Sequence, residues 1–313
     1  MPESRGAIGA LERVLYLKAI PAFRGMNNDA LAALADSARE RFHPRGSLIY
    51  DEATPVASIH HILDGRVRVT RGDALVMIAG PGTPMGALAV LAGVPMALRG
   101  TAEIDTISLE IDSEALMEVC EDHFSVVHAL LKYVARWIVD IERREGPQGA
   151  PPPKGGARRR LVDGELDLVE RIFYLRRFPV FSGASINALA ELSRGLTEVR
   201  FGPGVPLWSA GDAGPYALLV VEGSVDCVIP GMGVRFRAEP GWGLGTMEAI
   251  AELPRWHDAT TAGPVIALHG AMEGLIDVFE DNIEMAMSFL ALLSRGLISY
   301  IERRGAAGVP APA

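Results

Sequence analysis

The sequence predicts an α+β protein made of two tandem copies of one domain, each with N-terminal helices, a β-rich middle and a long C-terminal helix. Three observations predict this fold class. An internal repeat covers nearly the whole chain, each copy contains many short β-rich runs cut by turns, and each copy ends in a long apolar stripe at helical spacing. A chain of 313 residues has room for two domains that each bury a core.

The repeat is visible at both ends of the copies. Residues 12–25 align with 170–183, and residues 141–144 (Ile-Glu-Arg-Arg) align with 301–304. The spacing is 158 residues at the first pair (12 to 170) and 160 at the second (141 to 301). A drift this small over a whole domain indicates two copies of one fold that differ only by small insertions.

A Pro- and Gly-rich segment separates the copies. We expect domains at 1–145 and 164–313 and a linker at 146–163, because prolines and glycines at the density of 146–157 do not build a packed element. Each half is then expected to keep its own core. Arg158, Arg159 and Arg160 either dock an acidic partner, imitate a kinase substrate without an acceptor Ser or Thr, or form a solvated start to the next helix. Residues 305–313 are expected to be a frayed tail.

Within each copy the order of elements can be predicted. Residues 10–18 and 29–39 have helical apolar spacing, with a break at Pro21 and with Asp29 as the expected N-cap. Short β-rich runs bounded by turn residues follow, as expected for a sandwich or barrel that closes its own edges. The runs are 47–50, 59–63, 67–70, 75–78 and 104–111 in the first copy, and 217–221, 225–229 and 234–238 in the second.

Each copy ends in a helix with a wide apolar face. The stripes run from Phe124 to Ile141 and from Ile283 to Ile301, close to a/d spacing. Such a helix either packs only on its own barrel or also pairs with the helix of a partner. On the second interpretation the protein is a homo-oligomer, most simply a symmetric dimer.

Two glycine-led cassettes, 86–96 and 245–255, follow the same plan in the two copies. In each, a glycine comes after strand-like residues, a short apolar helix follows, and a proline stands nine residues after the glycine (Pro95 and Pro254). A helix entered through glycine directs free N–H groups towards an anion, usually phosphate. The plainer alternative is a strand–turn–helix connection.

This order of elements resembles the cyclic nucleotide-binding domain, which occurs in catabolite activator proteins and, in tandem, in regulatory subunits of protein kinase A. The resemblance covers nearly all of the chain except the linker and the tail. It implies an eight-stranded β-roll (a jelly roll) that holds a nucleotide against the cassette. In the family an arginine binds the cyclic phosphate, a glutamate accepts from the ribose hydroxyl, and the long helix covers the base.

The two cassettes depart from the family pattern to different degrees. In the first, Ala87 stands at the glutamate position and Met96 at the arginine position, so we expect no nucleotide there, and we expect Arg99 to be solvated. In the second, Arg255 is retained and a threonine replaces the glutamate. The candidate ligand-binding residues are therefore Gly245, Thr246, Met247, Glu248, Arg255 and Trp256.

Two further features of the second cassette affect the predicted site. Arg255 either binds the phosphate or pairs on the surface with Glu252 or Asp258. Trp256 and His257 stand where the family has two small alanines, so they are expected to crowd the pocket. We therefore expect a weaker affinity than in intact family members, and binding of cAMP or cGMP, if any, in the second domain.

Composition excludes several classes of protein. A net charge of −9 argues against a general nucleic-acid or anionic-membrane surface. Cys120 and Cys227 offer neither metal spacing nor a disulfide framework, and His60 and His61 would point to opposite faces of a strand, so no metal site is expected. We expect no signal peptide and no membrane span, and hence a cytoplasmic protein.

Three functional hypotheses follow. The leading one is a non-enzymatic regulatory or sensor protein of tandem cyclic nucleotide-binding-like domains, and the alternative is a ligand-free protein–protein interaction scaffold built on decayed cassettes. A jelly-roll enzyme is the third, but the sequence has no catalytic motif, and we expect no enzyme activity. No DNA-reading module is expected, because the long helices run into the linker and the tail. The sequence does not name the ligand or the protein partner.

Overall fold

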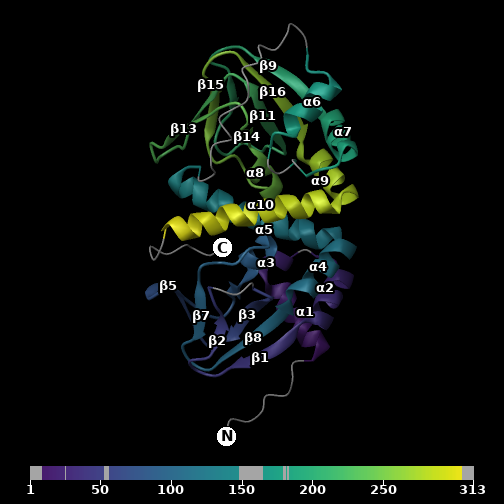
Figure 1. The fold of residues 1–313 in the computed structure, drawn as a ribbon. Helices are drawn as coiled ribbons and strands as arrows, with labels where there is room; N and C mark the ends of the chain where they lie inside the picture. Colours follow the sequence, from purple (N-terminus) through teal and green to yellow (C-terminus); the bar gives the residue numbers. More distant parts are fainter. Residues whose placement is uncertain are drawn as a thin grey trace. The chain divides into compact units, whose positions relative to one another are not determined.

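The computed structural model describes residues 9–24, 26–52, 56–147, 165–178, 181 and 183–304. Most of the predicted linker, its arginine triplet and the predicted tail therefore lie outside the described residues. The elements below are taken from the two repeats in turn (Figure 1).

The first repeat begins with α1 (Ala10–Ala19), the 3-10 turn η1 (Pro21–Phe23) and α2 (Asn28–Ser37). The predicted break at Pro21 is confirmed, since the fixed φ of proline starts a new turn there. The prediction that Asp29 caps the second helix is wrong. The side chain of Asn27 accepts from the Ala30 amide at 2.8 Å, and Asp29 lies in the first turn, because the helix begins earlier than its apolar spacing indicates.

The first β-roll consists of two antiparallel sheets in the described residues. Their strand orders are β1-β8-β3-β6 and β2-β7-β4-β5. The strands are β1 (Arg39–His43), β2 (Leu48–Tyr50), β3 (Ser58–Asp64), β4 (Val67–Arg71), β5 (Ala74–Ala79), β6 (Pro84–Met85), β7 (Arg99–Ala102) and β8 (Thr106–Asp112). The predicted runs are found with small shifts, whereas β1, β6 and β7 were not predicted because they show no apolar alternation.

The second repeat has the same architecture. It begins with α6 (Leu168–Leu175) and α7 (Ile186–Arg194), and its sheets have the orders β9-β16-β11-β14 and β10-β15-β12-β13. The strands are β9 (Leu196–Phe201), β10 (Pro206–Trp208), β11 (Tyr216–Glu222), β12 (Val225–Val228), β13 (Arg235–Ala238), β14 (Gly243–Leu244), β15 (Asp258–Thr261) and β16 (Val265–Ala271). The predicted fold class, two tandem β-rolls in an α+β chain, is confirmed.

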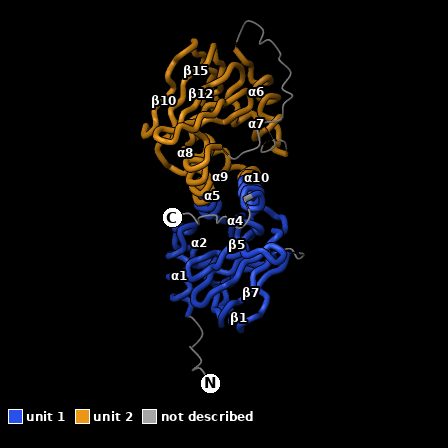
Figure 2. The backbone as a smooth tube through the Cα atoms, turned by 90° about the vertical axis from the view of Figure 1, so that its left-hand side faces the viewer, with its two compact units in different colours: residues 1–130, 290–313 blue, residues 131–289 orange. Residues whose placement is uncertain are grey.

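Each repeat closes with a pair of helices. These are α4 (Ser113–Asp122) and α5 (Phe124–Glu145) in the first repeat, and α9 (Met272–Asp281) and α10 (Ile283–Arg304) in the second. The compact units do not follow the repeats, because unit 1 comprises residues 1–130 with 290–313 and unit 2 comprises residues 131–289 (Figure 2). The second half of each long helix thus belongs to the unit that holds the other repeat's roll. The boundaries 1–145 and 164–313 remain a prediction.

Hydrogen bonds support this assignment of the helix halves. In unit 1 the Arg295 side chain of α10 donates to the carbonyl of Ala92 at 2.9 Å, and Arg71 of β4 donates to the carbonyl of Glu302. Leu297 and Ile298 are buried on the same part of α10. Most of the α5 stripe and half of the α10 stripe are buried within a single chain, so the stripes do not by themselves require a second copy. Self-association stays a prediction.

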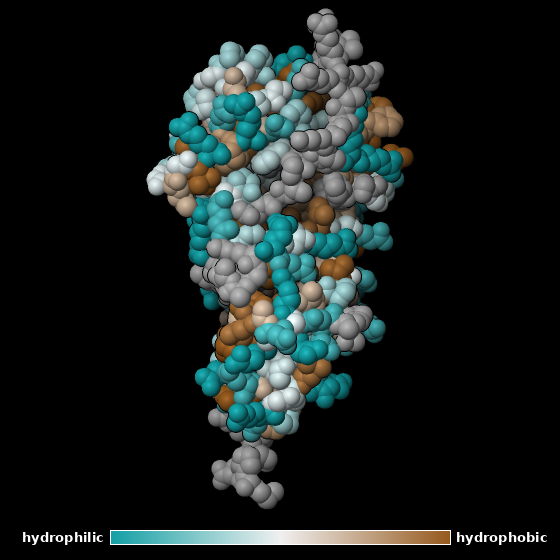
Figure 3. Space-filling view, turned by 60° about the vertical axis from the view of Figure 1, so that its left-hand side comes forward, coloured by the Kyte–Doolittle hydropathy of each residue, from teal (hydrophilic) through white to brown (hydrophobic). Residues whose placement is uncertain are grey.

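One helix in the described part of the chain, α10, is long and apolar enough to cross a membrane by length and composition alone. Of its most apolar window, 44% is buried inside the structure, and the core helix of a soluble protein passes the same test. On the face drawn in Figure 3, hydrophilic and apolar side chains are interspersed.

The shared helices predict that cutting the linker will not separate the repeats. With a protease site placed inside 148–164, the two fragments should elute together in native size-exclusion chromatography, because each compact unit contains residues from both fragments. A denaturing gel of the same peak should show two bands. Fragments that elute separately at micromolar concentration without denaturant would contradict this exchange of helix halves.

Candidate functional site

The two predicted cassettes are present as short helices entered through glycine. They are α3 (Ala87–Ala92), capped by Gly86 at φ 82°, and α8 (Thr246–Ala251), capped by Gly245 at φ 77°. Residues with a side chain rarely adopt this left-handed backbone conformation, which explains the glycine at both positions. The predicted glycine–helix plan is therefore confirmed in both rolls.

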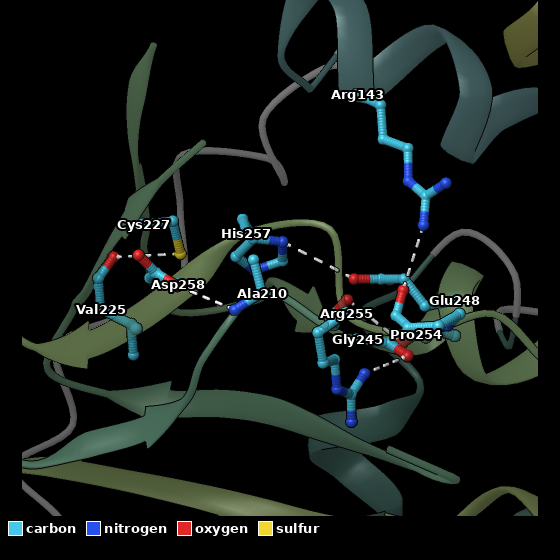
Figure 4. Close-up of polar contacts among 12 residues, drawn as sticks. Arg143, Ala210, Val225, Cys227, Gly245, Glu248, Pro254, Arg255, His257 and Asp258 are labelled. Atoms are coloured by element: carbon cyan, nitrogen blue, oxygen red, sulfur yellow. Dashed lines mark hydrogen bonds and ion pairs between the residues drawn. The ribbon is translucent and has the colours of Figure 1, made fainter. Parts of the chain in front are cut away.

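Arg255 lies buried behind the second cassette with 1% of its surface exposed. Its Nη1 donates to the carbonyl of Gly245 at 2.9 Å, and its Nη2 donates to the carbonyl of Tyr216 at 2.7 Å (Figure 4 shows the first of these bonds). A Cβ atom at Gly245 would stand 1.9 Å from Nη1, and one at Gly214 would stand 2.2 Å from Nε. Both glycines are therefore needed for the guanidinium to fit.

Two aromatic rings complete the surroundings of this guanidinium. Its Cζ lies 4.3 Å from the ring centre of Trp208 and 4.7 Å from that of Tyr216, within cation–π range. The alternative of a surface ion pair for Arg255 is wrong in the described structure. Glu252 pairs with Lys132 at 2.6 Å, and Asp258 accepts from the Ala210 amide at 2.8 Å.

Several buried polar atoms around Arg255 have no hydrogen-bond partner among the described residues. A buried donor or acceptor without a partner costs about 1–3 kcal/mol, so a group of them needs an explanation. The atoms are Arg255 Nε, Trp208 Nε1, Trp256 Nε1, Glu248 Oε1, His257 Nδ1 and His257 Nε2. Most of these atoms are hydrogen-bond donors. In addition, the positively charged guanidinium of Arg255 forms no ion pair with a carboxylate of the described residues.

Glu248 and His257 form a buried acid–base pair beside Arg255. Glu248 Oε1 lies 3.6 Å from His257 Nδ1, too far for a good hydrogen bond, and the two residues are 3% and 2% exposed (Figure 4). Burial raises the pKa of Glu248, against the opposing charges of Arg255 and Arg143. Burial, with help from Arg255, lowers the pKa of His257 to about 4. Both shifts favour the uncharged forms, so this pair does not cancel the charge of Arg255.

Neighbouring groups of the second roll and of α5 engage the remaining predicted site residues. The Thr246 hydroxyl donates to the carbonyl of Gly243 at 3.1 Å, so it is engaged in its own turn. Trp256 is 6% exposed and stacks on Phe236, with ring centres 5.5 Å apart and planes at 22°. Met247 packs beside Trp256 against a cluster that includes Val139 of α5.

The first cassette has no comparable charge. Ala87 offers no polar atom, and Met96 packs against the apolar core of the first roll. Arg99 is exposed and pairs with Asp51 at 3.1 Å, in keeping with the prediction that it is solvated. The first cassette thus keeps the backbone plan of the second without its buried arginine.

The first roll instead contains a polar chain that sequence analysis missed. Ser108 Oγ lies 2.9 Å from His43 Nε2 and 3.2 Å from His60 Nδ1, and Ser58 Oγ lies 3.1 Å from His60 Nε2. Ser58 also donates to Glu110 at 3.1 Å. The chain faces the inside of the roll, because Ile62, two residues from His60 on β3, packs in the core with β4 residues.

The charge of Glu110, at the end of this polar chain, decides which atoms donate and which accept in its hydrogen bonds. Burial works to raise the pKa of Glu110, but the bond from Arg41 and the neighbouring His60 and Ser58 bring it below its usual value. An ionised Glu110 accepts from the Ser58 hydroxyl, which makes His60 Nε2 a donor to Ser58 and His60 Nδ1 an acceptor from Ser108. With His60 neutral, every residue of the polar chain therefore has a hydrogen-bond partner of the right kind.

The second roll fills the same positions with apolar residues. By strand register, Ser108 corresponds to Ala267, His60 to Leu218 and His43 to Phe201. Ala267 and Leu218 are core residues, and Phe201 packs against them. The fold itself therefore does not require the polar chain. Sequence analysis could have found the contrast only by aligning these strands position by position.

In the described ranges, no three His, Cys, Asp or Glu side chains are grouped so that they could hold a metal ion. Both cysteines are buried and free, and burial raises the pKa of the Cys120 thiol to about 12. His60 and His61 are each 7% exposed on adjacent positions of β3.

Comparison with known proteins finds both sequence relatives and similar solved structures. No family model matches the chain. The CRP-like cAMP-activated global transcriptional regulator of Mycobacterium tuberculosis is 26% identical over 119 residues, which are 36% of this chain and 53% of the relative. The chain thus spans about half the length of the curated relatives it matches. Each repeat has N-terminal helices, an eight-stranded roll with a glycine-led cassette, and a long helix.

Solved structures of regulatory proteins are also similar to the chain. Among solved structures, the regulatory domain of Toxoplasma gondii PKA with cAMP is 15% identical, with 93% of this chain and 97% of that chain covered and a TM-score of 0.35. The N-terminal domain of a transcriptional regulator from Streptomyces coelicolor A3(2) is 24% identical, covering 42% and 94%, with a TM-score of 0.38.

Gly245→Ala should destabilise the protein by about 1–3 kcal/mol, because the new Cβ combines an unfavourable φ with a clash against Arg255 Nη1. Gly263→Ala is the matched control, since a Cβ there meets nothing within 4 Å. Chemical denaturation of both variants measures the difference. Equal midpoints for the two variants would contradict the close approach of Arg255.

The stability of the first roll should fall in acid because of His60. Burial lowers its pKa to about 4, whereas the unfolded residue titrates near 6.5. The unfolded chain therefore binds the proton first, so stability is full above about pH 6.5 and decreases towards pH 4, by up to about 3 kcal/mol.

His60→Leu, which introduces the residue found at Leu218 in the second roll, should flatten this acid dependence. Urea midpoints at pH 7.5, 6, 5 and 4 measure it. If the variant loses stability over the same pH range as the unaltered protein, His60 is not the group responsible.

Proposed function

We propose that this protein is a non-enzymatic regulatory module in which the second cassette, and not the first, binds an anionic ligand of the cyclic nucleotide class, such as cAMP or cGMP. The observation that carries the proposal is the buried Arg255 guanidinium. It has an unpartnered Nε and no ion-pair partner among the described carboxylates. A buried charge without a counter-charge favours binding of an anion.

The surroundings of Arg255 support the choice of a phosphate-type ligand. The indole Nε1 atoms of Trp208 and Trp256 and the ring of His257 add unpartnered donors to that of Arg255. Gly245 has no side chain between the cassette backbone and the guanidinium. A phosphate oxygen accepts several hydrogen bonds at once, which is what a group of unpaired donors requires.

The fit to a whole cyclic nucleotide is weaker at the ribose than at the phosphate. Thr246 stands where the family has its glutamate, and its hydroxyl already donates to Gly243. Glu248 is buried beside His257, and among the buried side-chain atoms of the described residues its Oε1 is the only carboxylate oxygen without a hydrogen-bond partner. We therefore expect a lower affinity than that of a cassette with a glutamate at position 246.

A ligand-free interaction scaffold is the second candidate, and the packing of Trp256 favours it. This ring stacks on Phe236 and belongs to the cluster of Val139 and Ile229, so a bulky, packed side chain stands where the family has a small alanine. Two of the guanidinium nitrogens of Arg255 also already have carbonyl partners. Self-association through the long helices and an unidentified protein partner belong to this second proposal.

Isothermal titration calorimetry on the full chain tests the first proposal, with cAMP, cGMP and inorganic phosphate as separate titrants. Arg255→Lys should weaken binding roughly ten- to a hundredfold, because it loses the forked donor while keeping the charge, and a lost charged hydrogen bond costs roughly 1.5–3 kcal/mol. Arg99→Ala, which removes the exposed arginine of the first repeat, is the control and should bind as the unaltered protein does.

The affinities of Arg255→Lys and the unaltered protein can be compared only if thermal denaturation shows that the variant is folded. Unchanged affinity in a folded Arg255→Lys variant would contradict the role of Arg255. No binding of any of the three titrants to the full chain would leave the scaffold as the better proposal.

A further inference from the structure

The second half of α5 belongs to unit 2, although it precedes the linker in the sequence. Unit 2 begins at residue 131, so residues 131–145 of α5 pack with the second roll and its cassette. The loop that they contact is 252–255, which joins the end of α8 to Arg255. A helix segment encoded in the first repeat therefore lies against the loop that carries the candidate ligand arginine.

Two cations of this helix segment converge on the loop. Lys132 Nζ forms an ion pair with Glu252 Oε2 at 2.6 Å. Arg143 Nη2 donates to the carbonyl of Pro254 at 3.4 Å, from the opposite end of the segment (Figure 4). The two cations are three helical turns apart, about 16 Å along the axis, so their long side chains hold the loop from two directions.

An apolar contact lies between the two cations. Val139 is fully buried and forms a core cluster with Trp256 and Ile229, and Leu253 packs against the same cluster. Val139 thus shares a core cluster with Trp256, the residue that follows Arg255. This segment of α5 thus packs with residues on both sides of Arg255 in the sequence, which restrains the loop against moving independently of the helix.

The backbone of the loop needs such support. Glu252 has φ of 54° and is the only non-glycine residue with a positive φ among the described residues. A residue with a side chain stays in this left-handed conformation only where its surroundings fix it. The ion pair with Lys132 holds the side chain of this very residue.

We infer that residues 131–145 of α5 position the 252–255 loop, and through it Arg255, so that ligand binding by the second cassette depends on a helix of the first repeat. Lys132, Val139 and Arg143 are positioning residues in this account. The part that concerns the ligand rests on the proposed function, whereas the positioning of the loop does not. Because coupling is reciprocal, a ligand held by Arg255 also stabilises the contacts of this helix segment.

Hydrogen exchange followed by mass spectrometry or NMR tests the positioning on the full chain without any ligand. The amides of Leu253 and Arg255 are suitable reporters, because they donate to the carbonyls of Glu248 and Asp212 at 2.9 Å. Val139→Ala should raise exchange at these amides about tenfold, which corresponds to a loss of about 1.4 kcal/mol. Lys132→Glu should raise it severalfold.

Two variants separate positioning from a general loss of stability. Arg136→Glu makes the same kind of charge change at an exposed site on the same helix and should leave exchange at both amides unchanged. Lys132→Glu combined with Glu252→Lys exchanges the two charges and restores an ion pair between the positions. It should bring amide exchange at Leu253 and Arg255 back towards the level of the unaltered protein. Wild-type exchange in Lys132→Glu and Val139→Ala alike, or no rescue by the exchanged pair, overturns the inference.

Titration with cAMP is the second arm. If the full chain binds cAMP, Lys132→Glu and Arg143→Glu should weaken binding while Arg136→Glu does not, and equal affinity in all three overturns the inference. If the full chain binds no cAMP, the proposed ligand fails, but the exchange measurements still decide whether α5 positions the loop. The two failures are therefore distinguishable.

Discussion

The burial of one guanidinium group constrains the whole second roll. A charge taken out of water must find partners, and Arg255 finds them in two carbonyl oxygens and two aromatic faces rather than in a carboxylate. This arrangement requires glycine at 214 and 245, since a side chain at either position would collide with the guanidinium. It also leaves a positive charge and an unpaired Nε beside the cassette, which is why the second roll remains the candidate ligand site.

The two rolls share a fold but distribute their polar groups differently. The second roll keeps an apolar sheet interior and concentrates its buried polar atoms at the cassette, around Arg255 and His257. The first roll has an apolar residue, Met96, at its cassette and carries its buried polar chain on the sheet, through His60 and Ser108. Because both rolls have the same backbone plan, this difference in buried polar groups lies in their side chains.

Much of this architecture could be predicted from the sequence because it depends on local patterns. The repeat spacing, the glycine-led cassettes and most of the strands follow from residue types at short range. The loss of charge at Ala87 and Met96 could likewise be read directly. The N-cap of α2 was predicted wrongly, as Asp29 instead of Asn27, because either residue caps well and apolar spacing does not determine where the first turn begins.

The rest depends on contacts between residues far apart in the chain. Arg255 bonds to the carbonyl of Tyr216, and a backbone carbonyl leaves no trace in the sequence. The apolar stripe of α5 indicates that the helix is buried but not which roll buries it, so the place of residues 131–145 in unit 2 could not be predicted. The polar chain joins residues from β1, β3 and β8, and β1 shows no alternation that would have marked it as a strand.

The central claim is that Arg255 keeps a free donor for an anionic ligand, and the Nε–Hε resonance of this side chain tests it most directly. In ¹H–¹⁵N spectra of the full chain, the resonance is assigned by its loss in Arg255→Lys, and its slow solvent exchange should confirm burial. The account predicts that this resonance shifts on titration with cAMP or a related cyclic nucleotide, saturating with the same midpoint as calorimetry. A resonance that stays in place while the ligand binds elsewhere would contradict the account.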